Sequence, residues 1–153
     1  MRFLIFLVFI FYINPSYSAT DDWTSYGKGS GGGHFSKADE ITPENVKKLE
    51  RVWVHRSGDY KGGANSAGVK GGEYQTSFQA TPLLVDDTLF YCTSYNRVFA
   101  LDPETGKEKW VFDPKLKKDG RAILACRGLS SWKDKTKSSS EKCHHRIMGV
   151  TID

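Results

Sequence analysis

The sequence of 153 residues lacks the features that identify several common protein classes. After its first residues it has no apolar run near the roughly 20 residues that span a bilayer. Its three cysteines form no Cys-x-x-Cys pair, which argues against a thioredoxin or a zinc ribbon. A basic run with interleaved aromatic residues is missing and the net charge is only +4, so nucleic-acid binding is not expected. A serine elbow of the form G-x-S-x-G is also absent, which disfavours that class of hydrolase.

Residues 1–18 predict a secretory signal peptide. Arg2 precedes an apolar run at residues 3–13, and Ser16 and Ser18 offer a small-residue cleavage site. An uncleaved anchor is the alternative. We therefore expect a mature domain at residues 19–153 that works outside the cytoplasm.

Cysteines in such a compartment can be oxidised. Cys126 and Cys143 bracket a polar stretch rich in lysine and serine, where a disulfide would hold a loop that little else stabilises, so we expect this pair to be bridged. Cys92 lies in an apolar run and is expected to be a buried free thiol. The segment Cys143-His144-His145 could be half of a metal site, but neighbouring residues on a strand point to opposite faces, so no metal is expected there.

Regularly spaced apolar runs predict a four-stranded antiparallel meander. The runs cover residues 80–85, 88–93, 97–102 and 107–112, and short turns separate them. A meander of this size is one blade of a β-propeller, although a β-sandwich could also contain it.

A strand type that bears tryptophan occurs twice, because residues 50–54 are similar to residues 108–111. Only the second copy has the rest of a blade before it. A circular array has such an isolated early strand when that strand completes its last blade. Residues 146–152 predict a strand of a following blade. One blade with parts of two others cannot close a ring, so we expect an incomplete all-β propeller with only the first blade or two present.

The other segments are predicted to be mainly loops. Residues 20–37 are rich in glycine, and residues 27–32 formally fit G-x-G-x-x-G, but no apolar strand precedes them. Thr42 is expected to cap a short helical turn that reaches Leu49. Residues 60–72 predict a long polar loop.

Five further residues have unremarkable interpretations. His34 and His55 have no carboxylate or cysteine at a useful spacing, so both are interpreted as loop or surface residues. Asp59 follows Ser-Gly and either caps a turn or accepts hydrogen bonds near a cofactor. Asp86 and Asp87 predict a hairpin turn.

Residues 100–110 have the form A-x-D-x-x-T-G-x-x-x-W. Asp102 and Thr105 can fold the turn through side-chain to backbone hydrogen bonds, and Gly106 can supply a positive φ. Trp110 is a large flat ring with one donor, which can wedge between two sheets. This segment resembles the tryptophan-docking motif of quinoprotein dehydrogenases, which use pyrroloquinoline quinone (PQQ).

The resemblance extends from about residue 23 to the end of the chain. It is closest to the start of the glucose, quinate and shikimate group of PQQ-dependent dehydrogenases. It implies a propeller of about eight blades with PQQ and a calcium ion near its axis. The calcium ligands are expected outside this segment. The fragments that carry the resemblance are residues 23–27, 41–42, 45–46, 53–59, 78–83, 126–129, 132 and 146–147.

The resemblance implies two cofactor contacts. Arg127 stands where the family has an arginine that hydrogen-bonds the quinone, although a loop-anchoring arginine is the alternative. Gln79 stands where many members have a glutamate that touches the cofactor, and an amide still donates and accepts. Arg121 and Ala122 replace the adjacent cysteines of the alcohol-oxidising members, and Ile123 replaces the histidine of the glucose-oxidising members. The substrate class therefore stays open, with the alcohol branch disfavoured.

The resemblance also implies a function. It implies a periplasmic protein that is secreted through the signal peptide, with membrane association left open. It also implies a sugar, a polyol or a cyclic hydroxy acid as substrate. In the family, calcium polarises the quinone, an aspartate takes the hydroxyl proton and hydride passes to the quinone. Electrons then go to a membrane quinone or a cytochrome. This segment alone is expected to be inactive. A non-enzymatic propeller that binds proteins in the envelope and a small secreted carbohydrate-binding sandwich are the alternatives.

Overall fold

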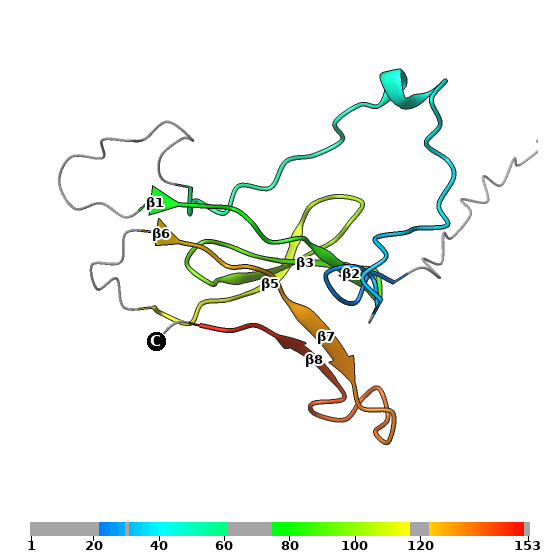
Figure 1. The fold of residues 1–153 in the computed structure, drawn as a ribbon. Coiled ribbons are helices and arrows are strands. Elements are labelled where there is room, and N and C mark those ends of the chain that lie inside the picture. The colour runs from blue at the N-terminus through cyan, green and yellow to red at the C-terminus, as the bar shows by residue number, and fades with distance from the viewer. Residues whose placement is uncertain (1–21, 30, 61–74, 117–122, 152–153) are drawn as a thin grey trace, which may run out of the picture.

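The computed structural model describes residues 22–29, 31–60, 75–116 and 123–151 (Figure 1). The predicted signal peptide and most of the loop expected at residues 60–72 lie outside these ranges. Apart from one 3-10 turn, η1 (Val46–Lys48), the described elements are strands, as expected for an all-β protein. No helix in the described ranges is long and apolar enough to cross a membrane. The strands are β1 (Gln75–Thr76), β2 (Leu83–Val85), β3 (Thr88–Cys92), β4 (Val98–Leu101), β5 (Glu108–Phe112), β6 (Ile123–Leu124), β7 (Ser130–Lys133) and β8 (His145–Met148).

The predicted meander is confirmed. Strands β2 to β5 form one antiparallel sheet in the order β2-β3-β4-β5. Asp86 and Asp87 connect β2 to β3 with φ angles of 47° and 51°. Positive φ at both central residues is the requirement of the two-residue hairpin turn whose twist matches that of the strands.

Both faces of this sheet are covered by other parts of the chain. On one face, alternating residues of β2 and β3 pack with Cys126 and Leu129, which both precede β7. On the other face lie Trp53 and His55, whose rings contact the turn after β4 and the aromatic residues of β3 and β4. The sheet therefore lies between an earlier and a later segment of the chain.

The segment predicted as a strand at residues 51–55 is extended but pairs with no strand of the described ranges. Its residues still alternate, because Trp53 and His55 are partly buried while Val52 is 84% and Val54 51% exposed. The alternation is that of a strand. The expected ladder is missing because the described residues hold no further strand beside this segment.

The predicted helical turn begins later than expected. It consists of η1, and the side chain of Thr42 is not its cap. Instead, Asn45 accepts a hydrogen bond from the backbone N–H of Thr42 through Oδ1, at 2.8 Å. The arm of residues 31–50 that contains η1 runs away from the sheets (Figure 1).

The cysteine prediction is wrong. Cys92 and Cys126 form a disulfide, and Cys143 is an exposed free thiol. The sheet explains this pairing, because Cys92 ends β3 on the face where Cys126 packs. Cys143 lies in the turn between β7 and β8. Proximity in the folded chain thus determines the pairing, whereas the polar composition of the loop does not.

The turn at residues 102–106 is built as predicted. Asp102 Oδ1 accepts hydrogen bonds from the backbone N–H groups of Glu104 and Thr105 and from the Thr105 hydroxyl. These bonds, first of all the one from the Thr105 N–H, hold the pKa of Asp102 below its usual value. Gly106 has φ +70°, which favours glycine.

The tryptophan that docks on this turn is Trp53. Its Nε1 donates to the carbonyl of Pro103 at 3.0 Å, and its ring lies against Gly106. Trp110 contacts Phe90, with ring centroids 5.7 Å apart, but is 44% exposed. The expectation that Trp110 is clamped between two sheets is therefore wrong for the described residues, since its ring is partly exposed and borders a cavity that His145 and Ile147 of β8 also line.

Candidate functional site

The residues predicted to touch a cofactor lie at one end of the meander. In an antiparallel sheet, the start of the first strand, the end of the second, the start of the third and the end of the fourth share one end. Gln79 precedes β2, Tyr95 lies in the turn between β3 and β4, and Asp113 follows β5. The disulfide brings residue 126 to the same end, because Cys92 closes β3.

Gln79 and Arg127 lie on neighbouring parallel segments. Strands β1 and β6 pair in parallel, and Thr81 forms a parallel bridge to Gly128 further along. Residues 75–81 and 123–128 thus run side by side between these two points (Figure 1). The structure therefore brings together the two positions that the sequence selected 48 residues apart.

Arg127 is exposed, and its guanidinium forms no hydrogen bond or ion pair with any residue in the described ranges. Gln79 is also exposed, and its Nε2 donates to the Ser77 hydroxyl at 2.9 Å. The Ser94 hydroxyl donates to the Ser77 carbonyl at 3.1 Å, which ties the turn after β3 to this segment. A free guanidinium and an amide on neighbouring segments suit an anionic ligand that carries carboxylate or carbonyl oxygens.

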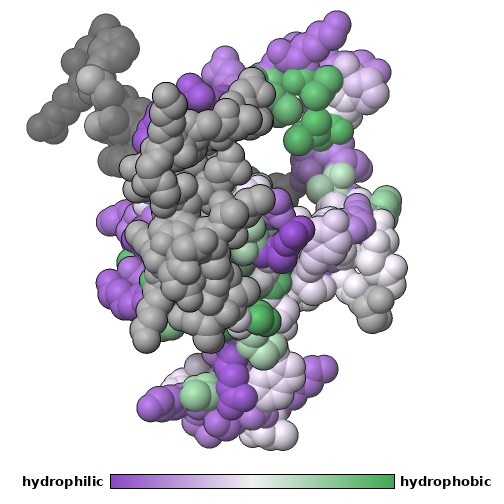
Figure 2. Space-filling model, turned by 60° about the vertical axis from the view of Figure 1, so that its left-hand side comes forward, coloured by the Kyte–Doolittle hydropathy of each residue, from purple (hydrophilic) through white to green (hydrophobic). Residues whose placement is uncertain are grey.

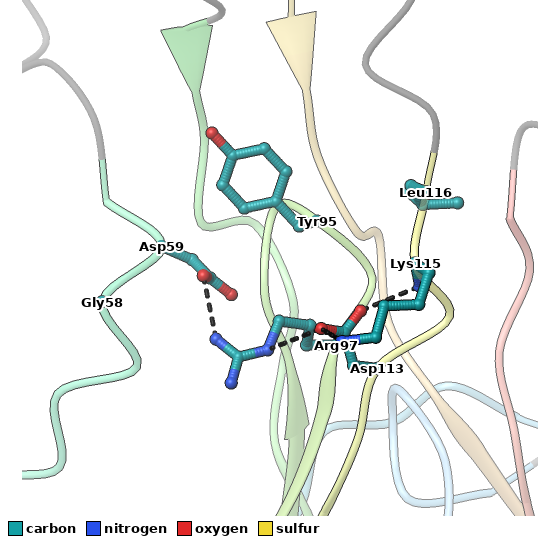
Figure 3. A pocket seen from close by; sticks show the side chains of 7 residues that line it. All are labelled: Gly58, Asp59, Tyr95, Arg97, Asp113, Lys115 and Leu116. Atoms are coloured by element: carbon teal, nitrogen blue, oxygen red, sulfur yellow. Dashed lines mark hydrogen bonds and ion pairs between the residues drawn. The ribbon is translucent and has the colours of Figure 1, made fainter.

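A charged cluster lies at the same end of the sheet (Figure 3). Arg97 Nη1 donates to Asp59 Oδ1 at 3.0 Å and to the Ser57 carbonyl at 3.1 Å. Its Nε lies 3.8 Å from Asp113 Oδ2, and Lys115 Nζ lies 3.0 Å from the same oxygen. A hydrogen bond from the Lys115 backbone N–H is the first cause that lowers the pKa of Asp113. The cluster borders a cavity of about 430 Å³, which Gly58, Tyr95 and Leu116 also line.

The cluster contains two carboxylates and two cations, so its charges balance. Arg97 joins the segment before residue 60 to the chain that follows β5. Asp59 is only 7% exposed, and its Oδ2 has no hydrogen-bond partner among the described residues. Asp59 is thus more than a turn cap, because its buried carboxylate pairs with the partly exposed guanidinium of Arg97. The sequence analysis did not select Arg97, its partner.

A second polar group was also missed. His55 Nδ1 lies 2.6 Å from the Tyr91 hydroxyl, and His55 Nε2 lies 2.7 Å from Glu108 Oε1. Burial raises the pKa of Tyr91 to about 12, with a smaller contribution from neighbouring acids, so this hydroxyl stays protonated. An ionised carboxylate only accepts, so in a neutral imidazole Nε2 would carry the proton and Nδ1 would accept from Tyr91. His55 lies two residues after Trp53, and strand alternation alone could have placed both rings on one face.

No group of three or more His, Cys, Asp or Glu side chains that could hold a metal ion occurs within the described ranges. The Cys143-His144-His145 segment contributes no such group. His145 instead lies 2.8 Å from the Ser131 hydroxyl across the β7–β8 pair, and burial lowers its pKa. Arg121 and Ala122 lie outside the described residues.

Comparison with known proteins identifies relatives. The chain is 38% identical over 135 residues to a quinoprotein glucose dehydrogenase of Escherichia coli, covering 85% of this chain and 16% of the relative. It is 36% identical over 141 residues to quinoprotein glucose dehydrogenase A of Acinetobacter calcoaceticus, covering 84% and 17%. It is also 36% identical over 109 residues to a quinate/shikimate dehydrogenase (quinone) of Acinetobacter baylyi, covering 71% and 12%. The chain thus spans less than a fifth of the length of these relatives.

A family model also matches, and it covers residues 23–153. Its description is PQQ, "Glucose/ethanol/alcohol dehydrogenase, beta-propeller domain". The match includes the meander, the docking turn and both segments that carry Gln79 and Arg127. The chain therefore belongs to the β-propeller family of PQQ-dependent quinoprotein dehydrogenases.

Proposed function

We propose that this chain is the N-terminal part of the propeller of a periplasmic PQQ-dependent dehydrogenase, and that Arg127 and Gln79 bind the cofactor. The observation that carries the proposal is the unpaired guanidinium of Arg127 on a segment that runs parallel to that of Gln79. Nothing in the described residues explains this arginine as a structural anchor. Family membership supports PQQ as the ligand.

When bound, PQQ supplies a quinone that accepts a hydride from the carbon of an alcohol. The residues of this chain would bind the cofactor and orient it. The planar guanidinium of Arg127 offers a rigid fork of donors for carboxylate or carbonyl oxygens. Gln79 can donate to one acceptor and accept from one donor, but it adds no charge. The calcium ion of the family would take its ligands from other parts of the protein.

Two further contacts tie segments of the chain together at this end of the sheet. The Ser94–Ser77 hydrogen bond fixes the segment of Gln79 to the turn after β3. The Arg97–Asp59 ion pair fixes the loop before residue 60 against β4. Such supporting contacts let a binding site keep its geometry before the ligand arrives.

The substrate class follows from the names of the relatives. They include the glucose and quinate/shikimate enzymes and a glycerol dehydrogenase large subunit of Gluconobacter thailandicus, which is 30% identical. We therefore propose a sugar, a polyol or a cyclic hydroxy acid as substrate. We propose a membrane quinone or a cytochrome as electron acceptor, because related enzymes are named for quinone and for cytochrome c.

The test is a titration of the complete gene product with PQQ in the presence of calcium, followed by substrate-dependent dye reduction. Arg127→Ala should weaken PQQ binding by about tenfold or more, because a charged hydrogen-bonded contact is lost. The PQQ affinity of Arg127→Lys should lie between those of the unchanged protein and Arg127→Ala, since lysine keeps the charge and loses the planar fork of donors. Arg51→Ala is the matched control, because Arg51 is an exposed arginine on the segment that carries Trp53, not on the segments of Gln79 and Arg127.

Two results would contradict the proposal. One is a complete gene product that binds no PQQ, and the other is an unchanged PQQ affinity in Arg127→Ala. A chimera gives a second measurement, with this chain replacing the matching 135 residues of the Escherichia coli relative. Its dye reduction with glucose should depend on Arg127 as well.

A further inference from the structure

We infer that the Cys92–Cys126 disulfide is a positioning device that holds Arg127 in the orientation needed to bind PQQ. The inference rests on the proposed function of Arg127. It concerns a pair of residues that does not itself touch the cofactor. The disulfide would act through the backbone of the residue that follows Cys126.

The disulfide joins the binding segment to a central strand of the sheet. Cys92 is the last residue of β3, which pairs with both β2 and β4. Both sulfur-bearing residues are buried, at 1% exposed for Cys92 and 5% for Cys126. The cross-link therefore anchors residue 126 to a strand that is hydrogen-bonded to a neighbouring strand on each side.

The side chain of Arg127 has no contact of its own that could fix it. It is exposed and forms no hydrogen bond or ion pair with the described residues. Its direction before ligand binding therefore depends on the backbone at residues 126–128. Disorder there would have to be removed when the ligand binds, which reduces affinity.

The two neighbours of Arg127 restrain the backbone unequally. Gly128 follows it at φ +154°, and glycine has the widest range of backbone conformations. A single bridge to Thr81 holds this glycine. The pairing of β6 with β1 extends over only two residues. The covalent restraint therefore comes from the Cys126 side.

A merely structural disulfide would have a different effect. It would stabilise the packing of the β7–β8 pair on the sheet through the core around Leu129, whatever residue stood at position 127. A positioning disulfide, in contrast, changes how much the guanidinium contributes to binding. The two roles are separated by a double-mutant cycle between the disulfide and Arg127.

The first measurement uses the complete gene product without cofactor. Replacing both cysteines, Cys92→Ser with Cys126→Ser, should accelerate amide hydrogen exchange in peptides covering residues 123–129 while peptides covering β4 remain protected. Cys143→Ser is the matched control, because Cys143 is exposed and unbridged. Equal exchange of residues 123–129 with and without the disulfide would overturn the inference.

The second measurement is the affinity for PQQ in four proteins: with and without the disulfide, each with Arg127 or with Arg127→Ala. We expect Arg127→Ala to weaken binding by about tenfold when the disulfide is present. Without the disulfide the same substitution should weaken binding by less than about threefold, because an unpositioned arginine contributes less.

The outcomes separate the two proposals. Equal losses in both backgrounds would refute the positioning role and leave the proposed function standing. No loss from Arg127→Ala in the disulfide-bonded protein would refute the proposed function itself. If the double serine variant does not fold, the native protein is reduced with dithiothreitol and alkylated after folding, and the same comparison is made on that material.

Discussion

The contact between Trp53 and Gly106 gives the sharpest prediction. A Cβ atom added at Gly106 would lie 2.5 Å from Trp53 Cε3 and 2.6 Å from Cδ2, far inside van der Waals contact. The ring cannot simply retreat, since its Nε1 donates to the Pro103 carbonyl at 3.0 Å. Gly106→Ala must therefore displace Trp53 or open the turn.

The cost has two parts. Alanine at φ +70° costs about 1–2 kcal/mol, because its Cβ crowds the backbone in the left-handed region. Loss of the indole hydrogen bond and the overlap with the ring add about 1–3 kcal/mol. We expect Gly106→Ala to lower the free energy of unfolding by about 2–5 kcal/mol in total.

Gly58 provides a matched control, because it has φ +79° and nothing within 4 Å of its added Cβ. Gly58→Ala should show only the conformational part, about 1–2 kcal/mol. The assay is urea unfolding of the complete gene product followed by circular dichroism. In a Trp53→Ala background the cost of Gly106→Ala should fall to that of Gly58→Ala. The reasoning is refuted if Gly106→Ala costs the same with and without Trp53.

Three further predictions use the same unfolding measurement. Replacing Cys92 and Cys126 together by alanine should cost about 4 kcal/mol, because the cross-link closes a loop of 34 residues in the unfolded chain; an unchanged midpoint would show that the bridge is not formed. Arg97→Ala should cost about 3 kcal/mol, since it leaves the buried carboxylate of Asp59 unpaired, and adding Asp59→Ala should recover part of that loss. Because burial lowers the pKa of His145, the unfolded chain binds this proton more tightly, so stability is full at neutral pH and falls as the pH drops below about 6.5; His145→Gln should flatten that part of the pH profile, and a parallel profile would contradict the assignment.

Local patterns in the sequence were enough to predict the meander. Its strands are short apolar runs that are separated by short turns. The residue types in those turns indicate the backbone conformation, as with Asp86 and Asp87, which have positive φ. The docking turn is similar, because Asp102 and Thr105 interact within four residues. Both predictions depend only on contacts that are close in the chain.

Partners that are distant in the chain could not be predicted in this way. The Cys92–Cys126 bridge depends on which face of the sheet the later segment covers, and composition does not contain that information. The Arg97–Asp59 pair, 38 residues apart, is formed for the same reason. Gln79 and Arg127 were selected only through a resemblance, and their adjacency depends on a parallel pairing that a run of two residues does not reveal.

The two tryptophans of the repeated strand type have opposite environments in the described part of the chain. Trp53 is docked on the turn of the following sheet, whereas Trp110, at the same place in the next copy, is 44% exposed. Apolar side chains are also exposed on the arm before Trp53, including Ile41 and Leu49. Figure 2 shows hydrophobic residues, in green, at the surface of the described part. The sheet β2–β5 thus receives the ring of Trp53 from the preceding segment and leaves the ring of Trp110 partly exposed, as expected of a repeat that packs against neighbouring repeats. A blade of a propeller has neighbours on both sides, so membership of a propeller family accounts for the environments of both tryptophans.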